Sequence, residues 1–215
     1  RRWAAREPAR GVRESTGAHP DRCEYGERMS TEQVETFLTL GSLLVLVALV
    51  VLALAAPLEW SGGVAPLSWI ADRIYGVELW AAFALAAIAM AGSLYFSEVA
   101  DYIPCTLCWY QRIAMYPLVF LFGIAAVRRD RGMALYGLVL SAVGAVIALY
   151  HLQLTWFPAQ ASFCKQGALC EVQWFKIWGF STIPYLALVA FAGIGALCLL
   201  SLWSGRRDTA EADED

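Results

Sequence analysis

Charged residues are scarce in this sequence. Asp, Glu, Lys and Arg together make up 16% of its 215 residues, whereas 59% are hydrophobic and the mean hydropathy is +0.53. A water-soluble domain does not bury so large an apolar fraction in its core. The net charge of −3 also gives no basic surface of the kind that binds nucleic acid. The composition therefore indicates an integral membrane protein.

The sequence also lacks any internal repeat with a period of about 20 to 50 residues. It has instead five long hydrophobic runs, each close to the roughly 20 residues that a helix needs to cross a bilayer. Because backbone polar groups must pair within each segment in lipid, we expect helices, and thus an all-α integral membrane protein. Only the third run contains a full charge, Arg112. The predicted spans are Thr36–Ala56, Leu79–Phe96, Leu107–Val127, Met133–Trp156 and Ile183–Trp203.

Arginine-rich loops predict the orientation of these spans, because short loops rich in arginine normally stay in the cytoplasm. Two such clusters are Arg128, Arg129 and Arg131 after the third span, and Arg206 and Arg207 after the fifth. The segments Ser97–Thr106 and Phe157–Thr182 are then expected outside. The lysines of the chain, Lys165 and Lys176, lie in the second outer segment and are a weak exception.

The N-terminal region conflicts with this orientation. Counting spans backward puts it outside, yet residues 1–28 carry seven arginines, which would favour the cytoplasm. We expect Met29 to be the natural start and residues 1–28 not to be native, since Ser30–Glu35 is acidic and suits an external tail. No basic region follows Met29 as a signal peptide would require. Alternatively, the first span crosses the other way and Pro57–Val77 lies along an interface. N-terminal sequencing of the native protein tests the Met29 start, and a native chain that begins before Met29 would exclude it.

A Cys-x-x-Cys motif stands where the third span begins, in the run Pro104–Arg112. Cys105 and Cys108 can close a small reducible ring, and the positive end of a helix dipole stabilises a thiolate. Arg112 follows Cys108 by four residues and so lies on the same helical face. A charge costs about 2.5–3.5 kcal/mol at the centre of a bilayer, and less near an interface. The motif therefore indicates redox chemistry with a partner dissolved in the membrane.

A second cysteine pair, Cys164 and Cys170, surrounds Gly167 in the long outer segment. Disulfides persist outside the cytoplasm, and closure over so short a spacing stabilises a fold less than a long-range bridge. We therefore interpret both pairs as reactive. A zinc site is not expected, because the two spacings lie on separate loops without a histidine in either. Cys198, inside the fifth span, is interpreted as a packing residue.

The segments Ala91–Glu98 and Ile103–Leu118 closely resemble the disulfide bond formation protein B (DsbB) family, and most closely its short BdbC-like branch. Trp178–Leu188, preceded by the Cys-x5-Cys pair, fits the same branch. The resemblance covers about Leu79 to Trp203, so the first span is an addition to a four-helix core. The chain divides into an N-terminal tail (1–35), an additional transmembrane helix (36–56), a connecting segment (57–78), a DsbB-like four-helix redox domain (79–203) and an acidic cytoplasmic tail (204–215).

This resemblance implies a four-helix transmembrane bundle that reoxidises a soluble thioredoxin-like (DsbA-like) dithiol oxidase outside the cytoplasm. The two electrons then pass to a membrane quinone, for which the BdbC-like branch favours menaquinone over ubiquinone. Such an oxidase–quinone relay keeps a bacterial periplasm oxidising.

The resemblance also implies residue roles. Cys164 forms the mixed disulfide with the partner, and Cys170 then exchanges with Cys105. Cys108 is left as the thiolate that faces the quinone, and Arg112 holds a ring oxygen or the thiolate charge. A further candidate for the quinone site is His151, which otherwise pairs with local polar groups.

Two other readings of the function stay open from the sequence. A vitamin K epoxide reductase-like quinone oxidoreductase is one, although Trp109-Tyr110-Gln111-Arg112 after Cys108 argues against it. A metal-binding transporter or assembly factor is another, although the spans have almost no polar residues near their centres. The residues 109–111 themselves either shape the quinone site or anchor the helix at the interface.

Overall fold

Helices dominate the part of the chain that the structure, a computed structural model, describes, namely residues 30–60, 66–157 and 174–212. One isolated antiparallel bridge joins Ile177 and Ser181. The all-α fold class is thus confirmed. The six helices are α1 (Thr31–Trp60), α2 (Pro66–Arg73), α3 (Glu78–Glu98), α4 (Thr106–Arg128), α5 (Met133–Trp156) and α6 (Ile183–Ala212).

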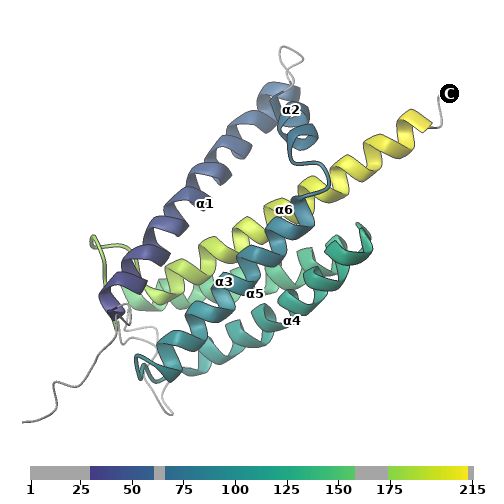
Figure 1. Cartoon of the computed structure of the whole chain (residues 1–215). Helices are drawn as coiled ribbons and strands as arrows, with labels where there is room; N and C mark the ends of the chain where they lie inside the picture. The colour runs from purple at the N-terminus through teal and green to yellow at the C-terminus, as the bar shows by residue number, and fades with distance from the viewer. Residues whose placement is uncertain (1–29, 61–65, 158–173, 213–215) are drawn as a thin grey trace, which may run out of the picture.

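Four of these helices, α3 to α6, form a closed bundle in which α3 packs on α4, α4 on α5, α5 on α6 and α6 on α3 (Figure 1). Its centre is filled by fully buried side chains that include Phe122, Phe191 and Ile194. Two glycines of α5 permit the close approach of its neighbours. A Cβ atom would collide with the ring of Phe122 at Gly137 and with the ring of Phe191 at Gly144.

The additional N-terminal helix α1 lies beside α6, outside the four-helix bundle (Figure 1). It begins at Thr31 rather than at Thr36, so Glu32 and Glu35 belong to the helix and not to an external tail. A capping box explains this early start. The Ser30 backbone N–H donates to Gln33 Oε1 at 2.8 Å, and the Gln33 N–H donates to Ser30 Oγ at 3.3 Å.

The connection between α1 and α3 contains a helix that the sequence analysis did not predict. This is α2, which packs against α1 and α6. Arg207 Nη1 lies 3.7 Å from Asp72 Oδ1 of α2. Arg131 Nη2 lies 3.2 Å from Glu78 Oε1 at the start of α3. The end of the bundle that carries the arginine clusters is therefore tied together by ion pairs.

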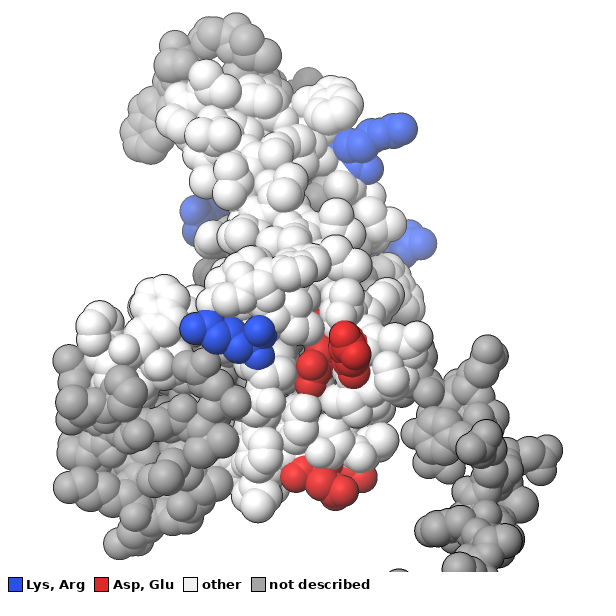
Figure 2. Space-filling model, turned by 90° about the vertical axis from the view of Figure 1, so that its left-hand side faces the viewer, with Lys and Arg blue, Asp and Glu red and all other residues white. Residues whose placement is uncertain are grey.

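Five of the helices, all except α2, are long and apolar enough to cross a membrane, as predicted. Their outward faces carry exposed Leu, Val, Phe and Trp side chains. Figure 2 shows one face of the molecule, most of which is free of charged side chains among the residues described.

The start of α1 contacts the loop before α4, so α1 runs from the end with Cys105 to the end with the arginine clusters. Residues 1–28, which we expect not to be native, lie outside the described residues.

Candidate redox site and adjoining cavity

The dithiol motif forms the entry to α4. Cys105 is the N-cap residue, with extended backbone angles, and its Sγ accepts a hydrogen bond from the Cys108 backbone N–H at 3.4 Å. Pro104 disfavours helical geometry in the residue before it, which helps to fix where the helix starts. The two Sγ atoms lie 3.0 Å apart, and both thiols are free. One helical turn therefore brings both sulfurs together.

Cys105 has a thiol whose pKa is well below its ordinary value. The largest cause is the hydrogen bond from the Cys108 side chain, and His151 and the Cys108 backbone N–H lower the pKa further against the opposing effect of burial. The helix N-terminus thus stabilises a thiolate on Cys105, the capping residue. This lowered pKa belongs to the reduced pair. The Cys108 thiolate that the family resemblance implies belongs to a different step, in which Cys105 is bonded to Cys170, and it stays a prediction.

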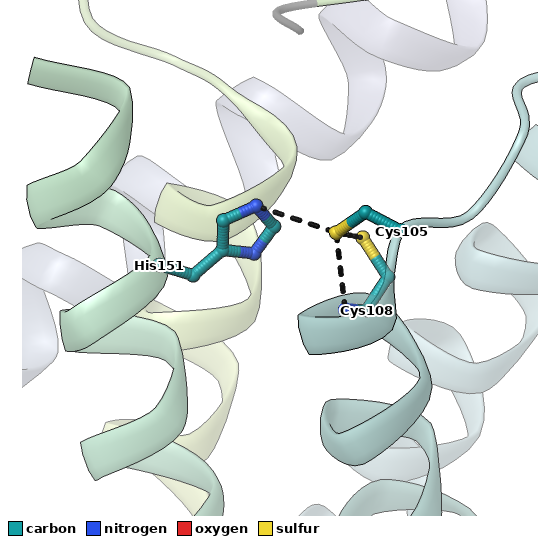
Figure 3. A group of neighbouring side chains, drawn as sticks. All are labelled: Cys105, Cys108 and His151. Atoms are coloured by element: carbon teal, nitrogen blue, oxygen red, sulfur yellow. Dashed lines mark hydrogen bonds between the residues drawn. The ribbon is translucent and has the colours of Figure 1, made fainter. Parts of the chain in front are cut away.

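His151 reaches Cys105 from the C-terminal end of α5 (Figure 3). Its Nε2 lies 3.7 Å from Cys105 Sγ, its Nδ1 lies 3.3 Å from Gln111 Nε2, and only 4% of the residue is exposed. When the Gln111 amide donates to Nδ1, a neutral ring carries its proton on Nε2 and donates it toward the sulfur. His151 is therefore a partner of Cys105.

An apolar cavity of about 280 Å³ lies beside Cys108, between α1, α3, α4 and α6. Cavities of about 150 Å³ in other proteins hold a benzene-sized ligand, so this one has room for a larger ring. Among the described residues, Cys108 and Arg112 line the cavity, whereas Cys105 and His151 do not. The prediction that Cys108 and Arg112 share a face is confirmed. The candidate His151 is not among the lining residues.

Arg112 is fixed in the cavity wall by α3. Its Nε donates to Ser93 Oγ at 3.0 Å and its Nη2 donates to the Ser93 carbonyl oxygen at 2.9 Å. The guanidinium carbon also lies 5.3 Å from the centre of the Trp109 ring. Sequence reasoning did not single out Ser93, although this serine lies within the segment Ala91–Glu98 that carries the family resemblance.

Aromatic side chains from α3 and from two loops line one end of the cavity. The Tyr102 ring stacks on Trp174 at 5.0 Å and on Phe96 at 5.7 Å, and all three residues line the cavity. The Tyr102 hydroxyl donates to Glu35 Oε1 of α1 at 2.7 Å. Burial, followed by this hydrogen bond, raises the pKa of Tyr102 to about 12. None of these contacts was predicted.

Three side chains of the site are also close enough to share a metal ion. The ligand atoms of Cys105, Cys108 and His151 all lie within 4.8 Å of one another. Two thiolates and an imidazole are a donor set that suits zinc, with a fourth position left open. The sequence analysis found no histidine within the cysteine loops, but His151 reaches the pair from α5.

The remaining cysteines have different positions. Cys164 and Cys170 lie outside the described residues, so their predicted roles stay predictions. Cys198 is 1% exposed within the hydrophobic core of the bundle. Its interpretation as a packing residue agrees with this position.

Comparison with known proteins gives one family. The family model described as "Disulfide bond formation protein DsbB" matches residues 77–201. The chain is 46% identical over 127 residues to "Disulfide bond formation protein C" of Bacillus subtilis, a match covering 58% of this chain and 92% of the relative. It is 44% identical over 118 residues to the "Probable disulfide formation protein" of Oceanobacillus iheyensis, covering 54% and 81% respectively. No solved structure matches the chain. Both α1 and α2 precede the matched region.

Proposed function

Because the chain belongs to the DsbB family of disulfide bond formation proteins, and so is a multi-pass membrane disulfide oxidoreductase, we propose that it reoxidises a thioredoxin-like (DsbA-like) dithiol oxidase outside the cytoplasm. The electrons pass to a membrane quinone, with menaquinone favoured over ubiquinone. The observation that carries this proposal is that the two cysteines of the dithiol have different surroundings. Cys108 lines an apolar cavity with Arg112, while Cys105 is paired with His151. Family membership also argues against the vitamin K epoxide reductase-like alternative.

The proposed reaction proceeds by thiol–disulfide exchange. A partner thiolate attacks Cys164 in a Cys164–Cys170 disulfide, which forms the mixed disulfide and releases Cys170 as a thiolate. Cys170 attacks the Cys105–Cys108 disulfide at Cys105, which releases Cys108 as a thiolate. The second thiol of the partner then displaces Cys164, and Cys164 attacks Cys170 in its bond to Cys105, so that Cys164–Cys170 re-forms and Cys105 and Cys108 are both left reduced. When the Cys105–Cys108 disulfide re-forms, its two electrons pass to the acceptor. Overall, one partner dithiol becomes a disulfide, and two electrons and two protons reach the acceptor.

The cavity residues fit a quinone. A bound quinone supplies the acceptor, taking up two electrons and two protons and leaving as the quinol. Arg112 is held at the wall by Ser93, so its charge is oriented before any ligand arrives. A fixed cation in an apolar cavity stabilises a negatively charged ring oxygen more strongly than it would in water. The apolar walls accept the ring and exclude water.

The proposal is tested by mixing purified protein with a reduced thioredoxin-like partner and either a menaquinone or a ubiquinone analogue, and following quinol formation. We expect Cys105→Ala and Cys164→Ala to abolish partner-dependent turnover. Arg112→Ala should raise the quinone KM about tenfold or more, because hydrogen bonds to charged groups contribute roughly 1.5–3 kcal/mol. Arg128→Ala, an exposed arginine at the opposite end of α4, is the control. Full activity in Cys105→Ala refutes the relay.

Metal binding is a second candidate function, favoured by the proximity of Cys105, Cys108 and His151. This reading predicts stoichiometric zinc in the purified reduced protein and its loss in His151→Ala. The relay instead predicts quinone reduction by protein that has been stripped of metal with a chelator. Elemental analysis and the quinol assay on the same preparation separate the two functions.

A further inference from the structure

We propose that α1 is part of the acceptor site: it closes one side of the cavity beside Cys108 and Arg112 and thereby selects the lipid-soluble acceptor by the size of its ring. This inference rests on the proposed function, and it assigns a role to a helix that precedes the region matched to the family. The acceptor is a quinone whose ring lies in the cavity and whose tail extends into lipid.

One face of α1 forms a wall of the cavity. Its lining residues are spaced so that they fall on a single helical stripe, while Val47, at 61% exposed, lies on the opposite, lipid-facing side. The stripe supplies no charge, so it contributes shape to the site. The α1 residues that line the cavity are Phe37, Leu38, Gly41, Ser42 and Val45.

Two buried polar contacts hold α1 at the end of the bundle that carries the dithiol. Glu35, 8% exposed, accepts the hydrogen bond from Tyr102, and Thr39 Oγ1 lies 2.8 Å from Ser181 Oγ with both residues fully buried. A polar group left unpaired in such surroundings is costly, so these contacts fix the helix in one position. Tyr102 keeps its proton at physiological pH because its pKa is about 12.

Glycines bring the wall close to the groups that bind Arg112. A Cβ atom at Gly92 of α3 would stand 3.0 Å from Leu38 Cδ1, and one at Gly193 of α6 would stand 2.8 Å from Val45 Cγ1. Gly92 directly precedes Ser93, the residue that holds Arg112. The α1 wall therefore lies where it can limit the size of a ring bound by Arg112.

The cavity opens toward lipid between α1 and α3. Phe37 of α1 is 63% exposed and Ile88 of α3 is 50% exposed, and both line the cavity. Lining residues with so much exposed surface mark a mouth on the lipid-facing side. A quinone tail leaves the cavity there, and no charged side chain lines the opening among the residues described.

Gly41 provides a clean test, because no atom lies within 4 Å of a Cβ built there although the residue lines the cavity. Gly41→Leu should fill part of the cavity without disturbing the fold. We expect the Kd of a naphthoquinone, measured on oxidised protein by quenching of tryptophan fluorescence, to rise about tenfold, and that of a benzoquinone to rise less. The estimate follows from the usual penalty for overfilling a packed site.

Ala53→Leu is the matched control, since Ala53 is exposed on α1 and does not line the cavity. A second test uses Tyr102→Phe and Glu35→Gln, each of which should raise the naphthoquinone Kd severalfold. Because the two residues form one hydrogen bond, the double variant should have a Kd no higher than that of either single variant. Equal Kd values for Gly41→Leu and Ala53→Leu would overturn the role of α1. Wild-type protein that binds and reduces neither quinone would instead overturn the proposed function itself.

Discussion

Two sulfurs only 3.0 Å apart have different surroundings in this protein. Cys105 caps the helix and contacts His151, whereas Cys108 lines an apolar cavity. The hydrogen bonds to Cys105 all stabilise its ionised form, which explains its lowered pKa. At the scale of single residues, the site is therefore asymmetric although the motif itself is nearly symmetric.

This asymmetry predicts a specific pH dependence. In the reduced Cys164→Ser/Cys170→Ser protein, thiolate absorbance near 240 nm should persist well below the ordinary cysteine pKa of about 8.5, because a lowered pKa keeps the thiolate until the pH falls through it. His151→Ala should move the midpoint upward, since it removes a hydrogen bond that stabilises the thiolate. Cys105→Ser should delete the transition. A titration midpoint near 8.5 in the Cys164→Ser/Cys170→Ser protein, with His151 intact, contradicts the assignment of the thiolate to Cys105.

Local spacing explains which residues of the site were predictable. Cys105, Cys108 and Arg112 lie within two helical turns, so sequence separation alone placed them together. His151, Ser93 and Glu35 come from other helices. Their contacts depend on how helices pack, and no pattern within a single segment encodes that packing.

Hydropathy identified the five membrane helices, because length and apolar content are read directly from sequence. It placed the start of α1 too late, since the acidic residues after Ser30 suggested a tail. The capping box formed by Ser30 and Gln33 was the signal for the true start. The helix α2 was missed because its eight residues are too few and too mixed in polarity to stand out.

Helix packing in the bundle depends on the glycines of α5. Gly144→Leu should cost roughly 1–3 kcal/mol or more of stability, because its side chain would meet the buried ring of Phe191. Unfolding in detergent, monitored by circular dichroism, measures this loss. Ala142→Leu, on the exposed side of the same helix, should change stability little. Similar midpoints for the two variants would show that α5 does not pack through Gly144.

At the scale of the whole molecule, the cysteine pair and the arginine clusters lie at opposite ends of the bundle (Figure 1). Arginine-rich loops stay in the cytoplasm, so we propose that the redox end faces outward. The family resemblance anticipated the four-helix bundle. It did not cover the first span, so the contact of α1 with the cavity was visible only in three dimensions.

Sidedness is measured with a membrane-impermeant maleimide on intact cells after mild reduction. Cys164 and Cys170 should be labelled without permeabilisation. Asp130→Cys, in the exposed loop between α4 and α5, should react only after the cells are permeabilised. Labelling in the reverse order would put the dithiol in the cytosol and exclude an extracytoplasmic partner.

The burial of Cys105, of which 6% is exposed, has a consequence for fidelity. Small soluble thiols such as glutathione have little access to a residue that is so buried. The neighbouring Cys108 lines an apolar cavity, which polar thiols enter poorly. Both sulfurs of the pair are thus shielded from small thiols in solution. Leakage of reducing equivalents from small thiols in solution into the pair is therefore suppressed.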